Sequence, residues 1–195
     1  MNKVTHTLIA ILALAFGLGA NASTNTINKL MVDTTRQILL TDVETFGLHL
    51  KEGDQSSYKL NIGGFINGSM ELTVKSVQAD EVVINQNMDL GFLGKQNCDE
   101  TINPNTGEVK KMVCNGQDQK QDTGDIELID SKEDTITVPA GTFTCMYIKA
   151  KIKKDNSEVE QWVNPKQVPV FGMVKMIAPS QIGKLTVELS SFKKN

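Results

Sequence analysis

From Ser57 onward, apolar and polar residues alternate in short runs that are separated by turn signals. Met70, Leu72 and Val74, for example, alternate with polar neighbours. A period of two buries one side of a β-strand and leaves the other side in water. Because no helical pattern separates the runs, we predict a meandering antiparallel sheet or barrel of about nine to ten short strands. The runs include residues 58–62, 70–75, 82–84, 126–128, 135–138, 142–153, 158–163, 168–177 and 185–189.

Residues 1–22 have the pattern of a secretory signal peptide. Lys3 precedes an apolar run of 11 residues, Leu8–Leu18, and Ala20-Asn21-Ala22 offers a cleavage site before Ser23. The run is too short to cross a hydrocarbon core of ~30 Å as a helix, so an uncleaved membrane anchor is the less favoured alternative. No cysteine for lipid attachment lies near the cleavage site. We therefore expect export to the periplasm or the extracellular space, with residues 23–195 forming one mature domain.

The segment between the signal and the first alternating run is ambiguous. Ile27, Leu30 and Met31 are spaced as on one side of a helix, but β-branched residues interrupt the pattern. We predict a small helical segment within residues 24–48. The chain has a net charge of −3, and loss of the signal with its single lysine would make the charge −4. Such mild acidity argues against nucleic acid and against an anionic membrane surface as partners.

The spacing of the cysteines predicts one disulfide. Cys98 and Cys114 lie on either side of a turn signal at residues 103–107, and a hairpin centred near Thr106 would place them opposite each other. Directly opposed strand residues have Cα atoms ~4.5–5.5 Å apart, which is within the reach of a disulfide. In an exported chain this bridge is expected to form. Cys145 is then left over, and we interpret it as a small buried apolar residue.

The residues needed for common catalytic and metal sites are scarce. The mature chain has one histidine, His49, and no Gly-x-Ser-x-Gly motif. A single histidine cannot build a multi-histidine metal site, and burial of Cys145 in a strand argues against a Cys–His nucleophile. The acid-rich stretches 118–125 and 130–134 lack the spacing of a calcium loop. We therefore predict a non-enzymatic protein without a catalytic residue, metal or cofactor, although a pair of carboxylates facing each other across a cleft stays an open alternative.

The unusual feature of the sequence is an excess of methionine and other apolar residues on the predicted strands. Residues 168–177 are apolar on both sides of the predicted strand, so this strand must be covered on both sides or line a cavity. A flexible methionine suits an irregular core and an adaptable lipid pocket equally well. The packed core is the simpler interpretation. If a pocket exists instead, the candidate ligand-binding residues are Met146, Trp162, Phe171 and Met173.

Three stretches carry a resemblance to a known group of proteins: VPAGTFTC at residues 138–145, WVNP at 162–165 and VPVFGMVK at 168–175. With them, residues 50–192 resemble uncharacterised bacterial exported proteins whose domain is similar to the LolA-like lipoprotein-carrier fold. The resemblance implies a curved antiparallel half-barrel whose concave apolar face is covered by helices and holds acyl chains. The segment 24–48 supplies few residues for such a cover. No ligand-contacting residue of the carriers maps onto this chain.

Three functions remain after these steps. The first is an exported, non-enzymatic β-domain protein of the bacterial envelope that binds a lipid or another apolar ligand. The second is an envelope interaction module with a packed core and no ligand. The third and weakest is a carboxylate-based hydrolase. No second long apolar run follows the signal, so we expect no membrane span in the mature chain and leave the protein partner open.

Overall fold

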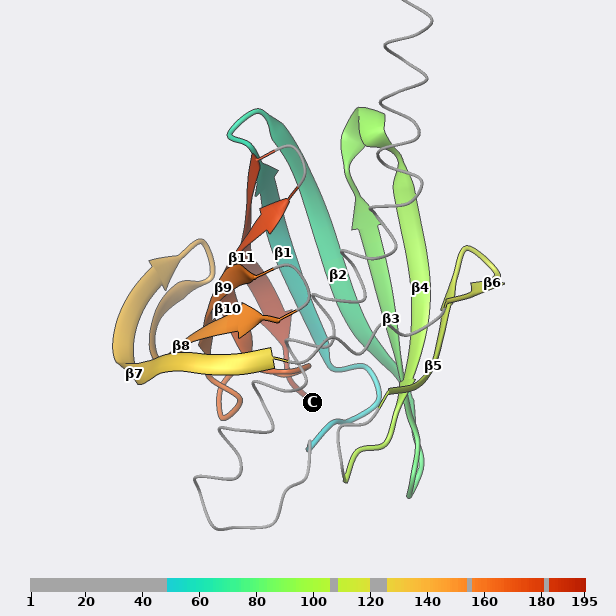
Figure 1. Cartoon of the computed structure of the whole chain (residues 1–195). Coiled ribbons are helices and arrows are strands. Elements are labelled where there is room, and N and C mark those ends of the chain that lie inside the picture. Colours follow the sequence, from blue (N-terminus) through green and yellow to red (C-terminus); the bar gives the residue numbers. More distant parts are fainter. Residues whose placement is uncertain (1–48, 106–108, 120–125, 154–155, 181–182) are drawn as a thin grey trace, which may run out of the picture.

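The computed structural model describes residues 49–105, 109–119, 126–153, 156–180 and 183–195. The predicted signal peptide, the predicted helical segment within residues 24–48, and residues 106–108 between the cysteines lie outside the described residues. Within those limits the chain forms eleven strands and one 3-10 helix (Figure 1). In chain order these are β1 (Gln55–Ile62), β2 (Ile66–Val77), β3 (Val82–Asp89), η1 (Gly91–Leu93), β4 (Lys95–Ile102), β5 (Val109–Cys114), β6 (Gln117–Asp118), β7 (Ile126–Val138), β8 (Gly141–Ile152), β9 (Ser157–Val163), β10 (Met173–Ser180) and β11 (Gly183–Lys193).

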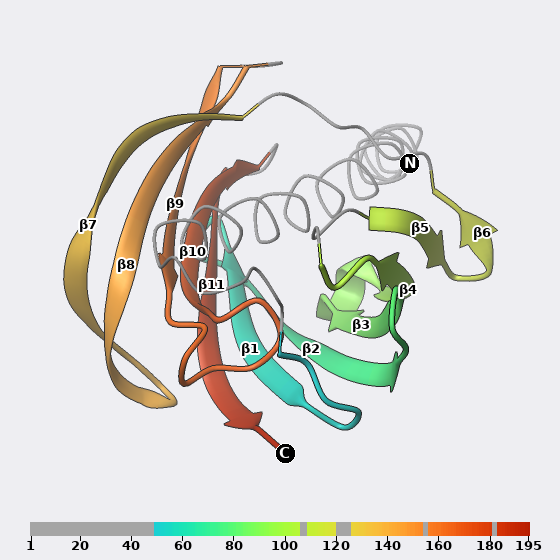
Figure 2. The same ribbon diagram turned by 90° about the horizontal axis from the view of Figure 1, so that it is seen from below.

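All described strands belong to one antiparallel sheet. Its spatial order is β6-β5-β4-β3-β2-β1-β11-β10-β9-β8-β7. Strands adjacent in sequence pair with each other except β6 and β7, which form the two edges, and β1 pairs with β11 at the centre. Figure 2 shows the sheet bent into an open arc with β7 at one end and β6 at the other. The predicted mainly β, curved antiparallel architecture is confirmed.

Two strands are longer than the alternation suggested. β3 covers residues 82–89 in one element, and β7 covers 126–138, including the charged stretch 130–134 that lies between the predicted runs at 126–128 and 135–138. β7 is an edge strand, and residues 127–135 on it, apart from the half-buried Asp134, are exposed. Charged side chains on an exposed edge discourage pairing with a second chain. A strand with water on both sides therefore lacks the alternation that marks a half-buried one.

The register places the buried side chains on one face of the sheet. Tyr58 and Leu60 of β1 stand opposite Leu189 and Val187 of β11, and Tyr58 also stands opposite Met70 of β2. All five side chains are at most 3% exposed. Their sequence neighbours on β1 and β2, such as the lysine at 59 and the glutamate at 71, point to the other face and are exposed. The buried face is the concave side of the arc.

The predicted strand at 168–177 is wrong in its first half. β10 begins at Met173, and the preceding residues form a buried loop. Val170, Phe171 and Gly172 have φ values of 51°, 69° and 68°, whereas a strand needs negative φ. The segment is apolar on both sides because it is enclosed as a loop, with Val168, Val170 and Phe171 at most 2% exposed.

Hydrogen bonds hold this loop, residues 164–172, against the concave face. The Ser56 hydroxyl donates to the Pro169 carbonyl oxygen at 2.8 Å, and the Tyr58 hydroxyl donates to the carbonyl oxygen of Met173 at 3.2 Å. Both donors come from β1. The loop is closed at its base by the Asn164 amide, which donates to the Gly172 carbonyl oxygen at 2.7 Å. The left-handed turn at 170–172 is thus fixed from both sides.

The Cys98–Cys114 disulfide is present, as the turn symmetry predicted. The register places the two residues directly opposite each other on β4 and β5, and both are buried. Cys145 is free and buried, as expected.

Removing the bridge should destabilise the fold. We expect the Cys98→Ala/Cys114→Ala variant to lose about 3 kcal/mol of unfolding free energy, because the bridge closes a loop of 16 residues in the unfolded chain. Urea unfolding measures this loss. Dithiothreitol should lower wild-type stability to the level of the variant and leave the variant unchanged. A reductant that destabilises both proteins equally would contradict the assignment.

Candidate functional site

A row of apolar side chains crosses the concave face, and one amide interrupts it. Ile148 on β8 stands opposite Gln161 on β9, which stands opposite Met176 on β10. The row continues through Val187 on β11 to Leu60 on β1. All five residues are at most 3% exposed. Gln161 is therefore the one polar side chain in a row that spans five strands.

The amide of Gln161 has no hydrogen-bond partner. Its Oε1 and Nε2 atoms are both buried, and neither is bonded to any group in the part of the chain that the structure describes. Each buried polar atom left unsatisfied costs roughly 1–3 kcal/mol. A primary amide offers one acceptor and two donor hydrogens. Gln161 could therefore form hydrogen bonds with a molecule that brings a donor and an acceptor to this face.

Glu100 is a second buried polar group on the same face. It lies on β4 between Ile84 of β3 and Met112 of β5 in the register, and it is 2% exposed. Its Oε1 atom is without a partner among the described residues. Desolvation by burial raises the pKa of Glu100 from 4.5 to about 8. The carboxyl group is therefore largely neutral at pH 7 and could donate one hydrogen bond.

Other buried polar groups on this sheet are satisfied. Asp54 accepts hydrogen bonds from the amides of Lys51 and Asn195 at 2.9 and 2.8 Å. The amide of Gln86 donates to the sulfur of Met70 at 3.2 Å. Since most buried polar atoms in proteins are bonded, the unpaired atoms of Gln161 and Glu100 stand out.

Met146 and Met173, two of the four predicted ligand residues, lie in one row across neighbouring strands. Met146 on β8 stands opposite Val163, which stands opposite Met173 at the start of β10, so these side chains form the row next to that of Gln161. Phe171 and Met173 are buried in the main hydrophobic core, at 2% and 0% exposure, and Met146 is half-buried. The alternation missed Gln161, although its spacing from Val159 and Val163 would have assigned it to the same face.

Trp162, the fourth, points to the opposite face. Its indole Nε1 donates to Asp134 Oδ2 at 2.8 Å, and its ring lies 4.9 Å from that of Tyr147. The ammonium group of Lys132 lies 5.2 Å from the Tyr147 ring centroid, and the Tyr147 hydroxyl donates to Glu160 at 3.3 Å. This convex cluster is internally bonded. Trp162 belongs to the same buried core as Phe171 and Met173, but its side chain faces away from the row that contains Met146 and Met173.

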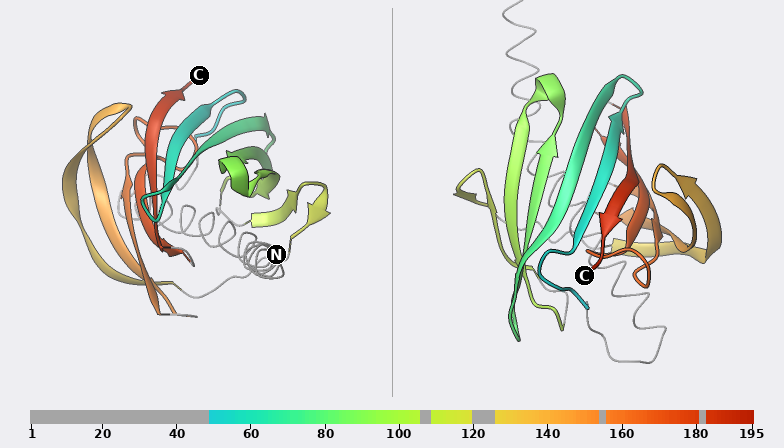
Figure 3. Two further views of the ribbon diagram at one scale, coloured as in Figure 1. Left: turned by 90° about the horizontal axis from the view of Figure 1, so that it is seen from above. Right: turned by 180° about the vertical axis from the view of Figure 1, so that it is seen from behind.

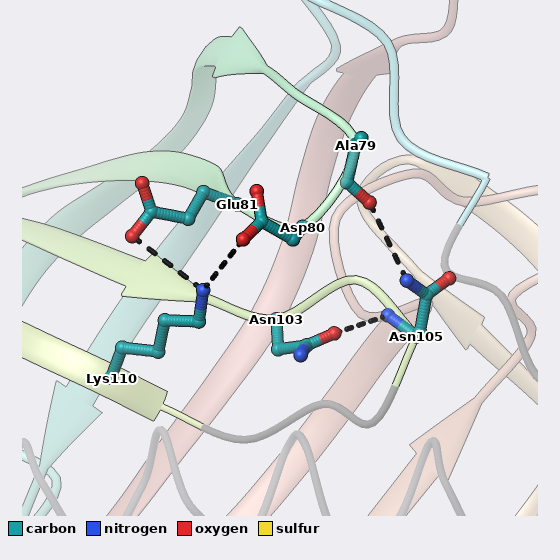
Figure 4. Close-up of polar contacts among 6 residues, drawn as sticks. All are labelled: Ala79, Asp80, Glu81, Asn103, Asn105 and Lys110. Atoms are coloured by element: carbon teal, nitrogen blue, oxygen red, sulfur yellow. Dashed lines mark hydrogen bonds and ion pairs between the residues drawn. The ribbon is translucent and has the colours of Figure 1, made fainter.

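A polar cluster joins two turns at the far end of the arc (Figure 4). Lys110 lies 3.6 Å from Asp80 and 3.6 Å from Glu81 at the turn between β2 and β3. The side-chain amide of Asn105 donates to the Ala79 carbonyl oxygen at 3.4 Å. The lysine thus bridges both acids, and the contacts pin the β4–β5 hairpin to its neighbour. We assign the cluster a structural role.

The described segments contain neither a metal-binding cluster nor a helix suited to span a membrane. No group of three or more His, Cys, Asp or Glu side chains there could hold a metal ion. No helix in those segments is long and apolar enough to cross a membrane. His49 is exposed, whereas Cys145 is buried, and its burial beside Asp134 raises the pKa of the thiol to about 12. Cys145 therefore stays protonated at neutral pH.

No protein-family model matches the sequence, and no curated protein matches it. Solved structures with some likeness include three of low identity. A Bacteroides fragilis protein, described as a candidate exported protein with a YmcC-like fold, is 14% identical, with a TM-score of 0.45, and the match covers 77% of this chain and 100% of that one. A Parabacteroides distasonis candidate lipoprotein is 14% identical, with a TM-score of 0.42 and coverage of 76% and 99%. MucB is 9% identical, with a TM-score of 0.41, and the match covers 73% of this chain and 53% of MucB, so the chain spans about half the length of MucB. None of these three is described as LolA-like, and that resemblance stays a prediction.

Proposed function

We propose that this chain is an exported, non-enzymatic protein of the bacterial envelope that binds an apolar ligand with a small polar group on the concave face of its sheet. One observation carries the proposal: the unpaired amide of Gln161 lies in the middle of a buried apolar row. Disulfides persist in oxidising compartments outside the cytoplasm, and the Cys98–Cys114 bridge supports the proposed location there.

The chemistry of the face suits an amphiphile such as a fatty acid. Small-molecule sites are mostly apolar, with a few placed polar groups that fix the orientation of the ligand. Met146 and Met173 would contact the chain of the ligand, and Gln161 would bond its polar end. A protonated fatty-acid carboxyl group matches a primary amide, because its hydroxyl can donate to Oε1 and its carbonyl oxygen can accept from Nε2.

A packed module without a ligand is the second candidate. Two observations favour it. Met173 is completely buried. The 164–172 loop, which is hydrogen-bonded to β1, already covers part of the concave face. Such a protein would use its outer surface to bind a partner.

Substituting Met173 distinguishes the two candidates. If Met173 borders a ligand, Met173→Trp should occupy ligand space and weaken binding of a fluorescent fatty acid at least ~10-fold, with little loss of stability. If Met173 is closely packed, wild-type protein should bind no probe and the variant should lose roughly 1–3 kcal/mol by overpacking. Fluorescence titration and urea unfolding measure both quantities. Met112→Trp, in the separate cluster beside the disulfide, is the matched control and should not change binding.

The variant Gln161→Leu distinguishes a ligand-binding role of Gln161 from a purely structural one. The change removes two unpaired buried polar atoms, so we expect stability to rise by about 1–3 kcal/mol. Binding of the fatty acid should fall in the same variant. A gain in stability without any effect on binding would assign Gln161 to a packed core.

A further inference from the structure

Two phenylalanines stand exposed on neighbouring turns at one end of the sheet. Phe65 lies in the turn between β1 and β2, and Phe92 lies in η1 between β3 and β4. Their side chains are 67% and 78% exposed, more than any other large hydrophobic residue that the structure describes. Both turns project from the same end of the sheet, as Figures 1 and 3 show.

The start of β2 and the end of β3, which adjoin the two turns, are in direct contact. A Cβ atom on Gly68 would lie 2.5 Å from the carbonyl oxygen of Asp89, so β2 and the end of β3 approach each other as only glycine allows. Leu90 and Leu93 pack against the main core from this end of the molecule. The apolar interior is therefore continuous with the tip that carries Phe65 and Phe92.

The surroundings of the tip carry little net charge. Lys95 pairs with Asp89 at 2.9 Å, and the amide of Gly91 donates to Asp89 at 2.9 Å, so the carboxylate is fully engaged. Lys184 is exposed beside the β1–β2 turn, where its carbonyl oxygen accepts a hydrogen bond from Gly63 at 2.9 Å. The tip thus has one ion pair, Lys95 with Asp89, and one further exposed cation, Lys184. The whole chain, by contrast, is mildly acidic.

We propose that this tip docks on a zwitterionic lipid bilayer, with Phe65 and Phe92 inserted at the level of the headgroups. The glycines at 63, 64, 91 and 94 give each phenylalanine neighbours without side chains. Energetically important residues of a protein interface lie instead within a ring of packed contacts. A bilayer surface needs no such ring, because its affinity follows the apolar area inserted. The low local charge matches a surface of no net charge, and Lys184 can reach a lipid phosphate. This inference is independent of the proposed ligand site.

Vesicle flotation tests the proposal with the protein in its exported form. Vesicles of phosphatidylcholine and phosphatidylethanolamine serve as the probe. Wild-type protein should float with the vesicles, and Phe65→Ser/Phe92→Ser should bind them at least ~10-fold more weakly because two inserted rings are lost. Leu128→Ser/Ile129→Ser removes two half-exposed apolar side chains from β7 and should bind like the wild type. Urea unfolding of the tip variant should match the wild type, since both phenylalanines are exposed.

Three outcomes would overturn the proposal. They are wild-type protein that stays in the bottom fraction, a tip variant that floats as well as the wild type, and an equal loss of binding in the β7 control. A protein partner for the tip would produce the first of these. Salt of 0.5 M should leave binding to these vesicles within about twofold, because insertion of the rings dominates the affinity. Loss of binding in salt would show a charge-driven contact instead.

Discussion

Raising the pH from 5 to 8 is expected to destabilise the wild-type protein, and Glu100→Gln should remove this part of the pH dependence. Burial of Glu100 raises its pKa from 4.5 in the unfolded chain to about 8 in the folded protein. Between these values the unfolded chain is ionised and the folded protein holds the proton, so unfolding releases a proton. Stability must then fall as the pH rises.

The size of this effect follows from linkage. One proton released on unfolding costs about 1.4 kcal/mol of stability for each pH unit, so two units within the window cost about 3 kcal/mol. Below pH 4.5 both states are protonated, and above about 8 both are ionised, so the contribution from this group levels off on each side. The adjacent residues in the register, Ile84 and Met112, are uncharged and offer the carboxylate no compensation.

Urea unfolding at several pH values tests this expectation. The difference in stability between wild type and Glu100→Gln should change steadily from pH 5 to 8, because the amide does not titrate. Glu71→Gln on β2 is the matched control, since Glu71 is exposed, and its curve should stay parallel to that of the wild type. Parallel curves for Glu100→Gln as well would mean that Glu100 ionises normally in the folded protein.

Gly172→Ala is the substitution from which we expect the largest loss of stability by a single methyl group. Gly172 has a φ of 68°, and a Cβ atom there would lie 2.6 Å from both the backbone nitrogen and the Cα atom of Pro165. The left-handed conformation costs an L-residue roughly 1–2 kcal/mol. The contact adds an overpacking cost of about 1–3 kcal/mol, because the backbone of Pro165 cannot turn aside as a flexible side chain would.

A second glycine separates the cost of the left-handed conformation from the cost of the contact with Pro165. Gly64 has a φ of 84°, but a Cβ atom there would have no neighbour within 4 Å. Gly64→Ala should therefore lose only the conformational part, about 1–2 kcal/mol. Urea unfolding of both variants gives the difference that the Pro165 contact causes. Equal losses would show that the 164–172 loop yields without cost.

The sheet itself was predictable wherever one side of a strand is buried. The runs around Tyr58 and Met70 alternate because one face meets the core, and the pairing of Cys98 with Cys114 followed from their symmetric distance from a turn. The charged stretch of β7 was not predictable by the same rule, since an edge strand with water on both sides has no reason to alternate.

The prediction of a strand at residues 168–172, which form a buried loop instead, failed for a different reason. Composition cannot distinguish a doubly buried strand from a buried loop, because both are apolar throughout, and the difference lies in the φ angles at residues 170–172. Only part of the candidate site could be predicted from the sequence. Met146 and Met173 were found by residue type, whereas Gln161 and Glu100 were passed over as ordinary polar residues. Their positions in the alternation would have revealed both, since Glu100 has the same parity as Cys98 and Ile102.

The pairing of β1 with β11 has a consequence for the order of folding. These strands lie at the centre of the sheet but near opposite ends of the described sequence, so the middle of the fold is completed by a strand that leaves the ribosome late. Until β11 arrives, β1 and β10 are two open edges that carry apolar side chains and can pair with other chains. Contacts of such long sequence separation also form slowly. The incomplete sheet is therefore open to wrong pairing for longer than a sheet whose central strands are neighbours in sequence.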